Sequence, residues 1–190
     1  MFKSLILAAA LVVSVSAQAS NSIGMFLFQK QIAQIQGAIS TQGLAWKVGD
    51  TNNYKLNMGG FINGTMKMYV RDINSDGIWM NQDVDMMIQK SKIEVLLNPA
   101  TGEVIKMIVD GKEQAAPKND SDIVEQKEAT VTVPAGTFKT IYLKLKDNAN
   151  GQTSEMWVNP RDIPLSGMAK SLADSQLGKV TIELTSFDKK

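Results

Sequence analysis

The chain has 190 residues, with 20 Lys plus Arg, 19 Asp plus Glu, a formal net charge of +1, and neither His nor Cys. The lack of Cys and His excludes disulfides, Ser-His-Asp and Cys-His catalysis, and metal sites that use His or Cys ligands. The near balance of charge gives no basic surface for nucleic acid or anionic lipid, so we expect neither partner.

The first nineteen residues have the features of a secretory signal peptide. Lys3 supplies the positive start, Leu5–Val15 the apolar core, and Ala17-Gln18-Ala19 a small-x-small cleavage site. This apolar run is shorter than the about 20 residues that a membrane-spanning helix needs. We therefore expect cleavage after Ala19 and a periplasmic or secreted protein that does not span a membrane. Residues 20–190 should then form a single β-rich domain with zero net charge, because Lys3 leaves with the leader.

An amphipathic helix is predicted over Ser22–Thr41, followed by Gly43 as a stop signal. Its apolar residues recur at spacings of three and four, at Met25, Phe28, Ile32, Ile35 and Ile39. We expect this helix to cover one face of a sheet.

From Leu44 onward the apolar residues alternate with polar ones, which is typical of β-strands. Turn signals rich in Gly, Asn, Asp and Pro separate about nine short strands, the clearest being Leu44–Val48, Asn53–Met58, Gly64–Arg71, Ile78–Ile88, Lys92–Leu97, Glu103–Asp110, Ile123–Val133, the run around Trp157, and Lys179–Phe187. One or two helical turns are expected over Ala169–Gln176. The predicted fold class is mainly β: a strongly curved antiparallel sheet, half-barrel or sandwich-like, with the N-terminal amphipathic helix.

The most informative stretch is Val131–Lys146, where two β-rich runs flank a Pro-Ala-Gly turn. Pro134 fixes φ near the value that a turn needs, and Gly136 permits backbone angles that other residues resist. Alternation after the turn places Phe138 and Tyr142 on one face of the second strand.

Several positions together resemble a group of bacterial envelope proteins. They are Trp46–Asp50, Tyr54, Trp79, Gly102, Asp110-Gly111, Val133–Phe138, Trp157, Pro164, Gly167, Lys170 and Glu183-Leu184. The chain resembles uncharacterised domain families of the periplasm and envelope whose β-rich fold is like that of the lipoprotein localisation factors. The resemblance implies a curved sheet, partly closed around an apolar concavity and covered by helices. It implies no catalytic residue.

The segment Asp72–Asp83 has the spacing of a calcium loop. Oxygen ligands would come from Asp72, Asn74, Asp76, the carbonyl of Ile78 and Asp83, with Gly at the sixth position. Strands rather than helices flank the segment, and its twelfth residue is Asp instead of Glu. A plain hairpin turn explains Asn74–Gly77 equally well. Calcium is therefore one of two interpretations, and no other cofactor is expected.

Methionine and aromatic residues supply the candidate ligand site. Methionine fills irregular apolar space and adapts to varied ligands, although most methionines simply belong to a core. The residues predicted to line an apolar concavity are Met66, Met68, Phe138, Tyr142 and Trp157.

Two functions follow from these patterns. The first is a non-enzymatic periplasmic module that holds an acyl chain, a lipid or a lipoprotein segment in the concavity. The alternative is an envelope structural or protein-interaction module with a filled core, acting through an exposed edge or loop. A Ser-Lys hydrolase is the least favoured option, since Ser166 and Lys170 carry no further nucleophile motif. An apolar pocket would favour the first function, and a filled interior the second.

Overall fold

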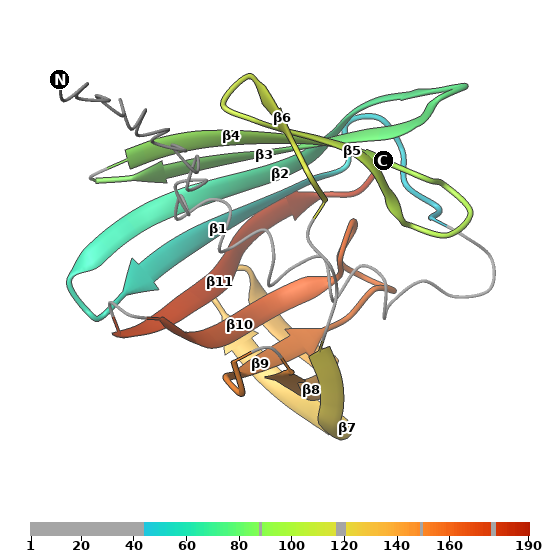
Figure 1. The fold of residues 1–190 in the computed structure, drawn as a ribbon. Helices are drawn as coiled ribbons and strands as arrows, with labels where there is room; N and C mark the ends of the chain where they lie inside the picture. The colour runs from blue at the N-terminus through green and yellow to red at the C-terminus, as the bar shows by residue number, and fades with distance from the viewer. Residues whose placement is uncertain (1–43, 88, 117–120, 149, 176–177) are drawn as a thin grey trace, which may run out of the picture.

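Eleven strands form one antiparallel sheet in the computed structural model, which describes residues 44–87, 89–116, 121–148, 150–175 and 178–190 (Figure 1). The strands are β1 (Thr51–Met58), β2 (Ile62–Asn74), β3 (Gly77–Met86), β4 (Gln89–Leu97), β5 (Val104–Val109), β6 (Lys112–Gln114), β7 (Ser121–Val133), β8 (Gly136–Asp147), β9 (Thr153–Val158), β10 (Met168–Ser175) and β11 (Gly178–Asp188). The expected signal peptide and the expected helix over Ser22–Thr41 lie outside the described residues.

The sheet consists of two meanders joined by the first and last strands. Its order is β6-β5-β4-β3-β2-β1-β11-β10-β9-β8-β7, so neighbouring strands are consecutive in sequence everywhere except at the pair β1 and β11, and the consecutive strands β6 and β7 form the two edges. These two strands pair from Thr51 opposite Asp188 to Met58 opposite Val180. The predicted last strand, Lys179–Phe187, therefore lies in β11 and pairs with the first strand, β1.

The sheet is strongly curved at its C-terminal end. β7 is three places from β10 in the strand order, yet it contacts both β10 and β11. The turn between β7 and β8 reaches β11, where the Ala135 amide donates to the Leu184 carbonyl oxygen at 3.1 Å. Beside this bond the rings of Phe138 and Phe187 lie 6.2 Å apart between centroids. In Figure 1 the strands β7–β10 accordingly run below the β1–β5 meander and across it.

Methionine fills much of the core face of β1–β5, the face that also carries Leu56 and Ile93. Six methionines there are at most 3% exposed: Met58, Met66, Met68, Met80, Met86 and Met107. Leu184 of β11 and the segment Ile163–Leu165 belong to the same apolar cluster. Flexible thioethers suit a strongly twisted face, because they fill spaces that branched side chains leave open.

The structure confirms the mainly β, curved antiparallel fold and corrects three details. The sheet has eleven strands rather than about nine. Helical turns were expected over Ala169–Gln176, but Ala169–Ser175 belongs to strand β10, because pairing with β9 and β11 overrides the helix propensity of Ala and Leu; Gln176 lies outside the described residues. Leu44–Val48 is not a strand, because Asp50 folds this segment into a turn by accepting the Lys47 amide at 2.8 Å. No α-helix occurs in the described residues, and hence none there that could span a membrane.

Candidate functional site

The residues predicted to line one concavity are distributed over three places. Met66 and Met68 lie in the core face of β2 and are 1% and 0% exposed. Phe138 packs against Phe187. Tyr142 and Trp157 form an edge-to-face pair, 5.2 Å between centroids, and the strand register places them on the sheet face opposite Met66. The structure thus brings together two pairs of the predicted residues rather than all five.

Tyr142 and Trp157 belong to a row of side chains that crosses most of the sheet, which we call the cross-strand row. Register places its members opposite one another on successive strands, in the order Lys127, Tyr142, Trp157, Lys170, Glu183, Lys55, Thr65, Asp85 and Lys90. The Lys127 ammonium lies 4.9 Å from the Tyr142 ring centroid, and the Lys170 ammonium 6.0 Å from that of Trp157. Such contacts hold side chains in place across strands.

Glu183 is the electrostatic centre of the cross-strand row. Its two carboxylate oxygens receive Lys170 Nζ at 2.8 Å and Lys55 Nζ at 2.7 Å, and its side chain is 16% exposed. Burial raises the pKa of the Glu183 carboxyl, but hydrogen bonds and attraction from the two ammonium groups outweigh burial, so the pKa lies below its ordinary value. Each of the two carboxylates in the row is therefore paired with lysine of the same row, Glu183 with Lys55 and Lys170, and Asp85 with Lys90.

A polar cluster lies within the core face where the segment Pro164–Met168 meets β1. Asn52 Nδ2 donates to the Tyr54 hydroxyl at 3.0 Å and to the Pro164 carbonyl at 2.9 Å. The Tyr54 hydroxyl donates to the Met168 carbonyl at 3.2 Å, and burial raises the pKa of this phenol. Two side-chain oxygens of the cluster, Asn52 Oδ1 and Ser166 Oγ, are buried without a hydrogen-bond partner in the described chain.

Gln82 of β3 is a further buried polar side chain on the core face, two strands away from Asn52 of β1. It faces Met68, which in turn faces Asn52, so the three side chains share one row of the core face. Gln82 is 0% exposed, and neither its amide nitrogen nor its amide oxygen has a hydrogen-bond partner among the described residues. Buried polar groups are nearly always satisfied in native proteins, so an exception of this kind points to an additional partner.

The predicted calcium ligands do not converge. Asn74 Oδ1 accepts the Asp76 amide at 2.9 Å and Asn74 Nδ2 donates to Asp72 at 3.0 Å, so both ends of this side chain serve the turn. Ile78 pairs with Ile73 and Leu97 inside the sheet. Asp83 lies five residues further along β3, about 16 Å at about 3.3 Å per residue. The arrangement favours the hairpin alternative, and no group of three acidic side chains in the described residues could hold a metal ion.

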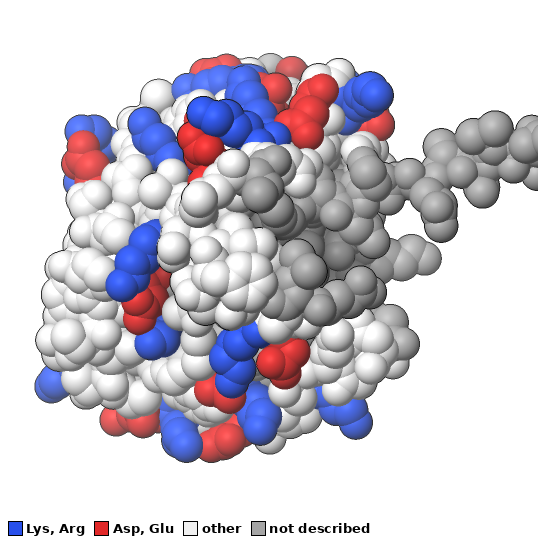
Figure 2. All heavy atoms as spheres, turned by 90° about the vertical axis from the view of Figure 1, so that its left-hand side faces the viewer, with Lys and Arg blue, Asp and Glu red and all other residues white. Residues whose placement is uncertain are grey.

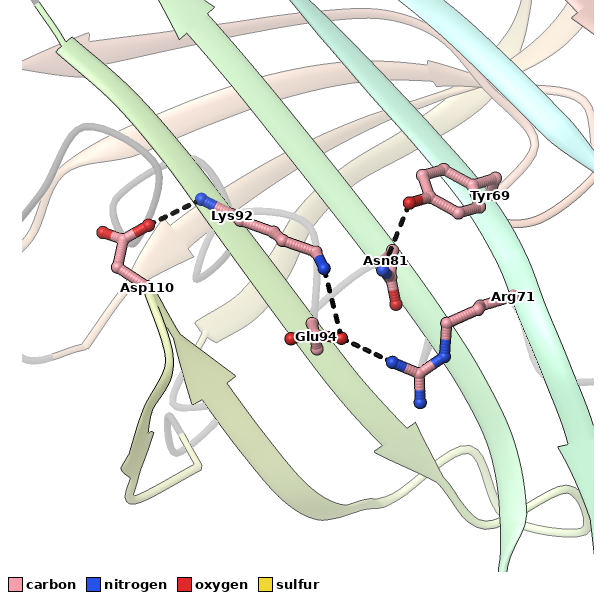
Figure 3. A network of polar contacts seen from close by, with 6 residues as sticks. All are labelled: Tyr69, Arg71, Asn81, Lys92, Glu94 and Asp110. Carbon is pink, nitrogen blue, oxygen red and sulfur yellow. Dashed lines mark hydrogen bonds and ion pairs between the residues drawn. The ribbon is translucent and has the colours of Figure 1, made fainter.

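A second polar network covers the face of β2–β5 opposite the core (Figure 3). Arg71 and Lys92 both point at Glu94, and Lys92 Nζ lies 3.5 Å from its carboxylate. Arg71 also stacks on the Trp79 ring at 4.7 Å. Asn81 Nδ2 donates to the Tyr69 hydroxyl at 3.2 Å. As in the cross-strand row, opposite charges are paired across strands.

Charged side chains of both signs are also interspersed on the side of the molecule drawn in Figure 2. Lys and Arg do not gather there into an extended patch of one sign, and uncharged surface separates the charged groups. This side therefore presents no strong field to a highly charged ligand.

An open groove of about 920 Å³ lies where β8 separates from β9. Among its lining residues we call the uncharged Ala129 of β7, Thr140 and Ile141 of β8 and Val158 of β9 the floor, and the charged Glu128, Lys139, Arg161 and Asp162 the rim. The pairing of β8 with β9 ends at Ile141 opposite Val158, and the groove begins where this pairing stops. Sequence analysis did not identify this site, although the dipeptide Asn159-Pro160 is a turn signal that marks its wall.

Asn159 fixes the wall of the groove. Its Nδ2 donates to the Lys139 carbonyl at 3.0 Å and to Asp162 at 2.7 Å, while its Oδ1 accepts the Arg161 and Asp162 amides at 3.1 and 3.0 Å. Its main-chain amide donates to the Gly167 carbonyl at 2.7 Å. Gly167 has a φ of +69°, and a Cβ there would lie 2.6 Å from the Pro160 nitrogen, so this approach requires glycine. The hydrogen bonds of Asn159 and the close approach at Gly167 thus fix the position of the groove wall.

Comparisons with known proteins give only distant likenesses. No protein-family model matches the chain, and no curated protein matches it. One similar solved structure is a Bacteroides fragilis protein with a YmcC-like fold, inferred to be exported, at 10% identity and a TM-score of 0.44. Another is from Parabacteroides distasonis, inferred to be a lipoprotein, at 12% identity and a TM-score of 0.39. Each match covers 79% of this chain and 100% of the other.

Proposed function

We propose that this protein is a non-enzymatic module of the cell envelope that binds an extended polypeptide segment in the groove between β8 and Asn159–Asp162. The observation that carries the proposal is the groove itself, whose volume of about 920 Å³ is in the range of ligand sites. The export expected from the signal peptide gives the compartment.

The chemistry of the lining favours a polypeptide over an acyl chain. The floor offers Ile141, which is 40% exposed, for an apolar side chain. The rim offers Lys139 and Arg161, neither of which forms an ion pair within the described chain, together with Glu128 and Asp162. An acyl chain would remove these charges from water without compensation, whereas a peptide supplies hydrogen bonds and charges of its own.

Selection of peptides from a random phage-displayed library tests this function. Peptides selected on the wild type should bind Ile141→Glu at least about tenfold more weakly, a loss of about 1.4 kcal/mol, because a carboxylate then occupies the apolar floor. Ile105→Glu is the matched control, since Ile105 is also exposed, at 54%, but lies on β5 outside the groove, so its replacement should leave binding unchanged. Both changes are at the surface, so equal melting temperatures should confirm folding. Selected peptides that bind Ile141→Glu as well as the wild type would refute the proposal.

A second candidate function is the holding of an apolar ligand against the core face, and the buried amide of Gln82 favours it. Ligand sites are mostly apolar with a few polar groups placed for orientation, as Gln82, Asn52 and Ser166 are among the methionines. It ranks second because Met66 and Met68 are fully packed, so a ligand would have to displace them.

A dansyl-labelled fatty acid tests this second function. If the Gln82 amide orients a ligand, Gln82→Met should abolish probe binding while keeping or raising stability, because an unsatisfied buried amide is replaced by a side chain of similar shape. If the wild type does not bind the probe, the second function is wrong.

A further inference from the structure

The free edge of β7 is long and exposed. β7 has thirteen residues and stands last in the strand order, with β8 as its strand partner in the described chain. The side chains from Asp122 to Glu128 are all exposed, and Ile123 and Val124 are 53% and 52% exposed. The opposite edge is β6, which has three residues. A long edge presents main-chain donors and acceptors that another strand can pair with.

The charges of this edge are self-complementary in one register. A two-fold axis perpendicular to a sheet sets one residue of the strand opposite its own copy. With Gln126 on the axis, Glu125 faces Lys127 of the partner subunit, and the symmetric pair repeats this contact. The side-chain amide of Gln126 then faces that of its own copy at the axis. Opposite charges directly across strands stabilise pairing.

Neighbouring registers do not match. Placing Glu125, Lys127 or Glu128 on the axis would set identical charges against each other, which destabilises pairing. Placing Val124 there would put the bulge between Ile123 and Glu125 at the centre of the interface. Glu125 and Lys127 already pair with each other at 2.7 Å within one strand, so pairing about the axis would exchange two ion pairs within subunits for two between them.

We propose that a second copy of this chain pairs antiparallel with β7 about a two-fold axis at Gln126, joining two eleven-stranded sheets into one. The inference goes beyond the proposed function because it uses the main-chain edge of β7, although Glu128 belongs both to this edge and to the lining of the groove. The pairing involves few residues, so the dimer should be weak and dependent on concentration.

Cysteine cross-linking tests both the dimer and its register, because the chain has no Cys of its own. Residues directly opposite in an antiparallel pair have Cα atoms about 4.5–5.5 Å apart, a distance that a disulfide spans. Gln126→Cys should therefore give a disulfide-linked dimer under mild oxidation. Thr130→Cys, on the same edge strand but away from the axis, is the matched control and should not. Equal cross-linking of the two variants would overturn the register.

Charge reversal tests the same interface by sedimentation. Glu125→Lys should weaken association at least about tenfold, since it sets like charges together twice, and Glu125→Lys combined with Lys127→Glu should restore it. A wild type that stays monomeric at high concentration would overturn the proposal. Peptide binding in the groove would be unaffected by that result, so failure of the dimer and failure of the proposed function are distinguishable.

Discussion

Glu183 shows how one side chain can organise a surface made of neighbouring strands. It accepts Lys55 from β1 and Lys170 from β10, which are both adjacent to β11 in the sheet. A pair that is 16% exposed on the acidic side is less screened by solvent than a fully exposed pair. We therefore expect it to contribute more to stability than the exposed pair between Asp85 and Lys90 in the same row.

The lowered pKa of Glu183 gives a prediction with a defined sign. A carboxyl whose pKa is lower in the folded state stabilises the protein above its unfolded pKa, near 4.5, and this stability is lost as pH falls through the folded pKa. Glu183→Gln should therefore lower the melting temperature at pH 7, and the difference from the wild type should shrink below about pH 4.5. Asp85→Asn is the control and should have little effect at either pH. Thermal unfolding followed by circular dichroism measures both, and a pH-independent difference would contradict the pKa argument.

Alternation along the chain predicted which residues of single strands face the core, but not which residues meet across strands. The sequence predicts that Met66 and Met68 line an apolar surface, and both are buried on the core face of β2. The contacts of Glu183 with Lys55 join residues far apart in sequence, so they depend on a register that only the assembled sheet sets. The same limit explains why Tyr142 and Met66, predicted to share a site, lie on opposite faces.

At the scale of elements, the hairpin between β2 and β3 illustrates a motif with two meanings. Oxygen-rich side chains at regular spacing suit both a calcium loop and a tight turn, because Asn and Asp also cap their own main chain. Here Asn74 caps the Asp76 amide, and Gly77, with a φ of +142°, brings the chain so close to the Leu97 carbonyl that a Cβ would lie 2.4 Å away. The hairpin thus accounts for Asn74, Asp76 and Gly77 without a cation.

We expect millimolar calcium to leave the melting temperature of the wild type unchanged. A site on the native state alone would add about 2.7 kcal/mol of stability when free calcium is 100 times its dissociation constant. Asp76→Ala removes one of the proposed ligands and leaves the core intact, so it should respond to calcium as the wild type does. A calcium-dependent rise in the melting temperature that Asp76→Ala abolishes would restore the calcium interpretation.

Strand β10, where local composition predicted helical turns, also depends on strand pairing that local sequence does not reveal. Ser171 and Ala173 are small and buried, so their apolar pattern is weak in the sequence even though they face the core. Their strand conformation is set by β9 and β11 on either side.

The groove was missed for a related reason. It exists only where β8 and β9 separate, and this separation depends on the strand register rather than on residue type.

At the scale of the whole molecule, the two meanders share one apolar cluster. Methionines from β1–β5 pack in it with Leu184 and with Ile163 from the connection before β10. The first and last strands, β1 and β11, pair in the middle of the sheet, and the two meanders run outward from them to the edge strands β6 and β7. Because both meanders contribute side chains to this cluster, its packing depends on the complete sheet.

Whether this shared core is filled decides between the two proposed functions, and Met68→Trp tests it. In a packed core the larger ring should cost roughly 1–3 kcal/mol of unfolding free energy through overpacking. Met87→Trp is the control, because Met87 is 79% exposed and its replacement should change stability by less than about 0.5 kcal/mol. Chemical denaturation measures both variants. We expect the full cost at Met68, since its side chain is 0% exposed and lies between Asn52 and Gln82. If Met68→Trp instead unfolds like the wild type and loses binding of the labelled fatty acid, the ring has entered open space, and the core face rather than the groove holds the ligand.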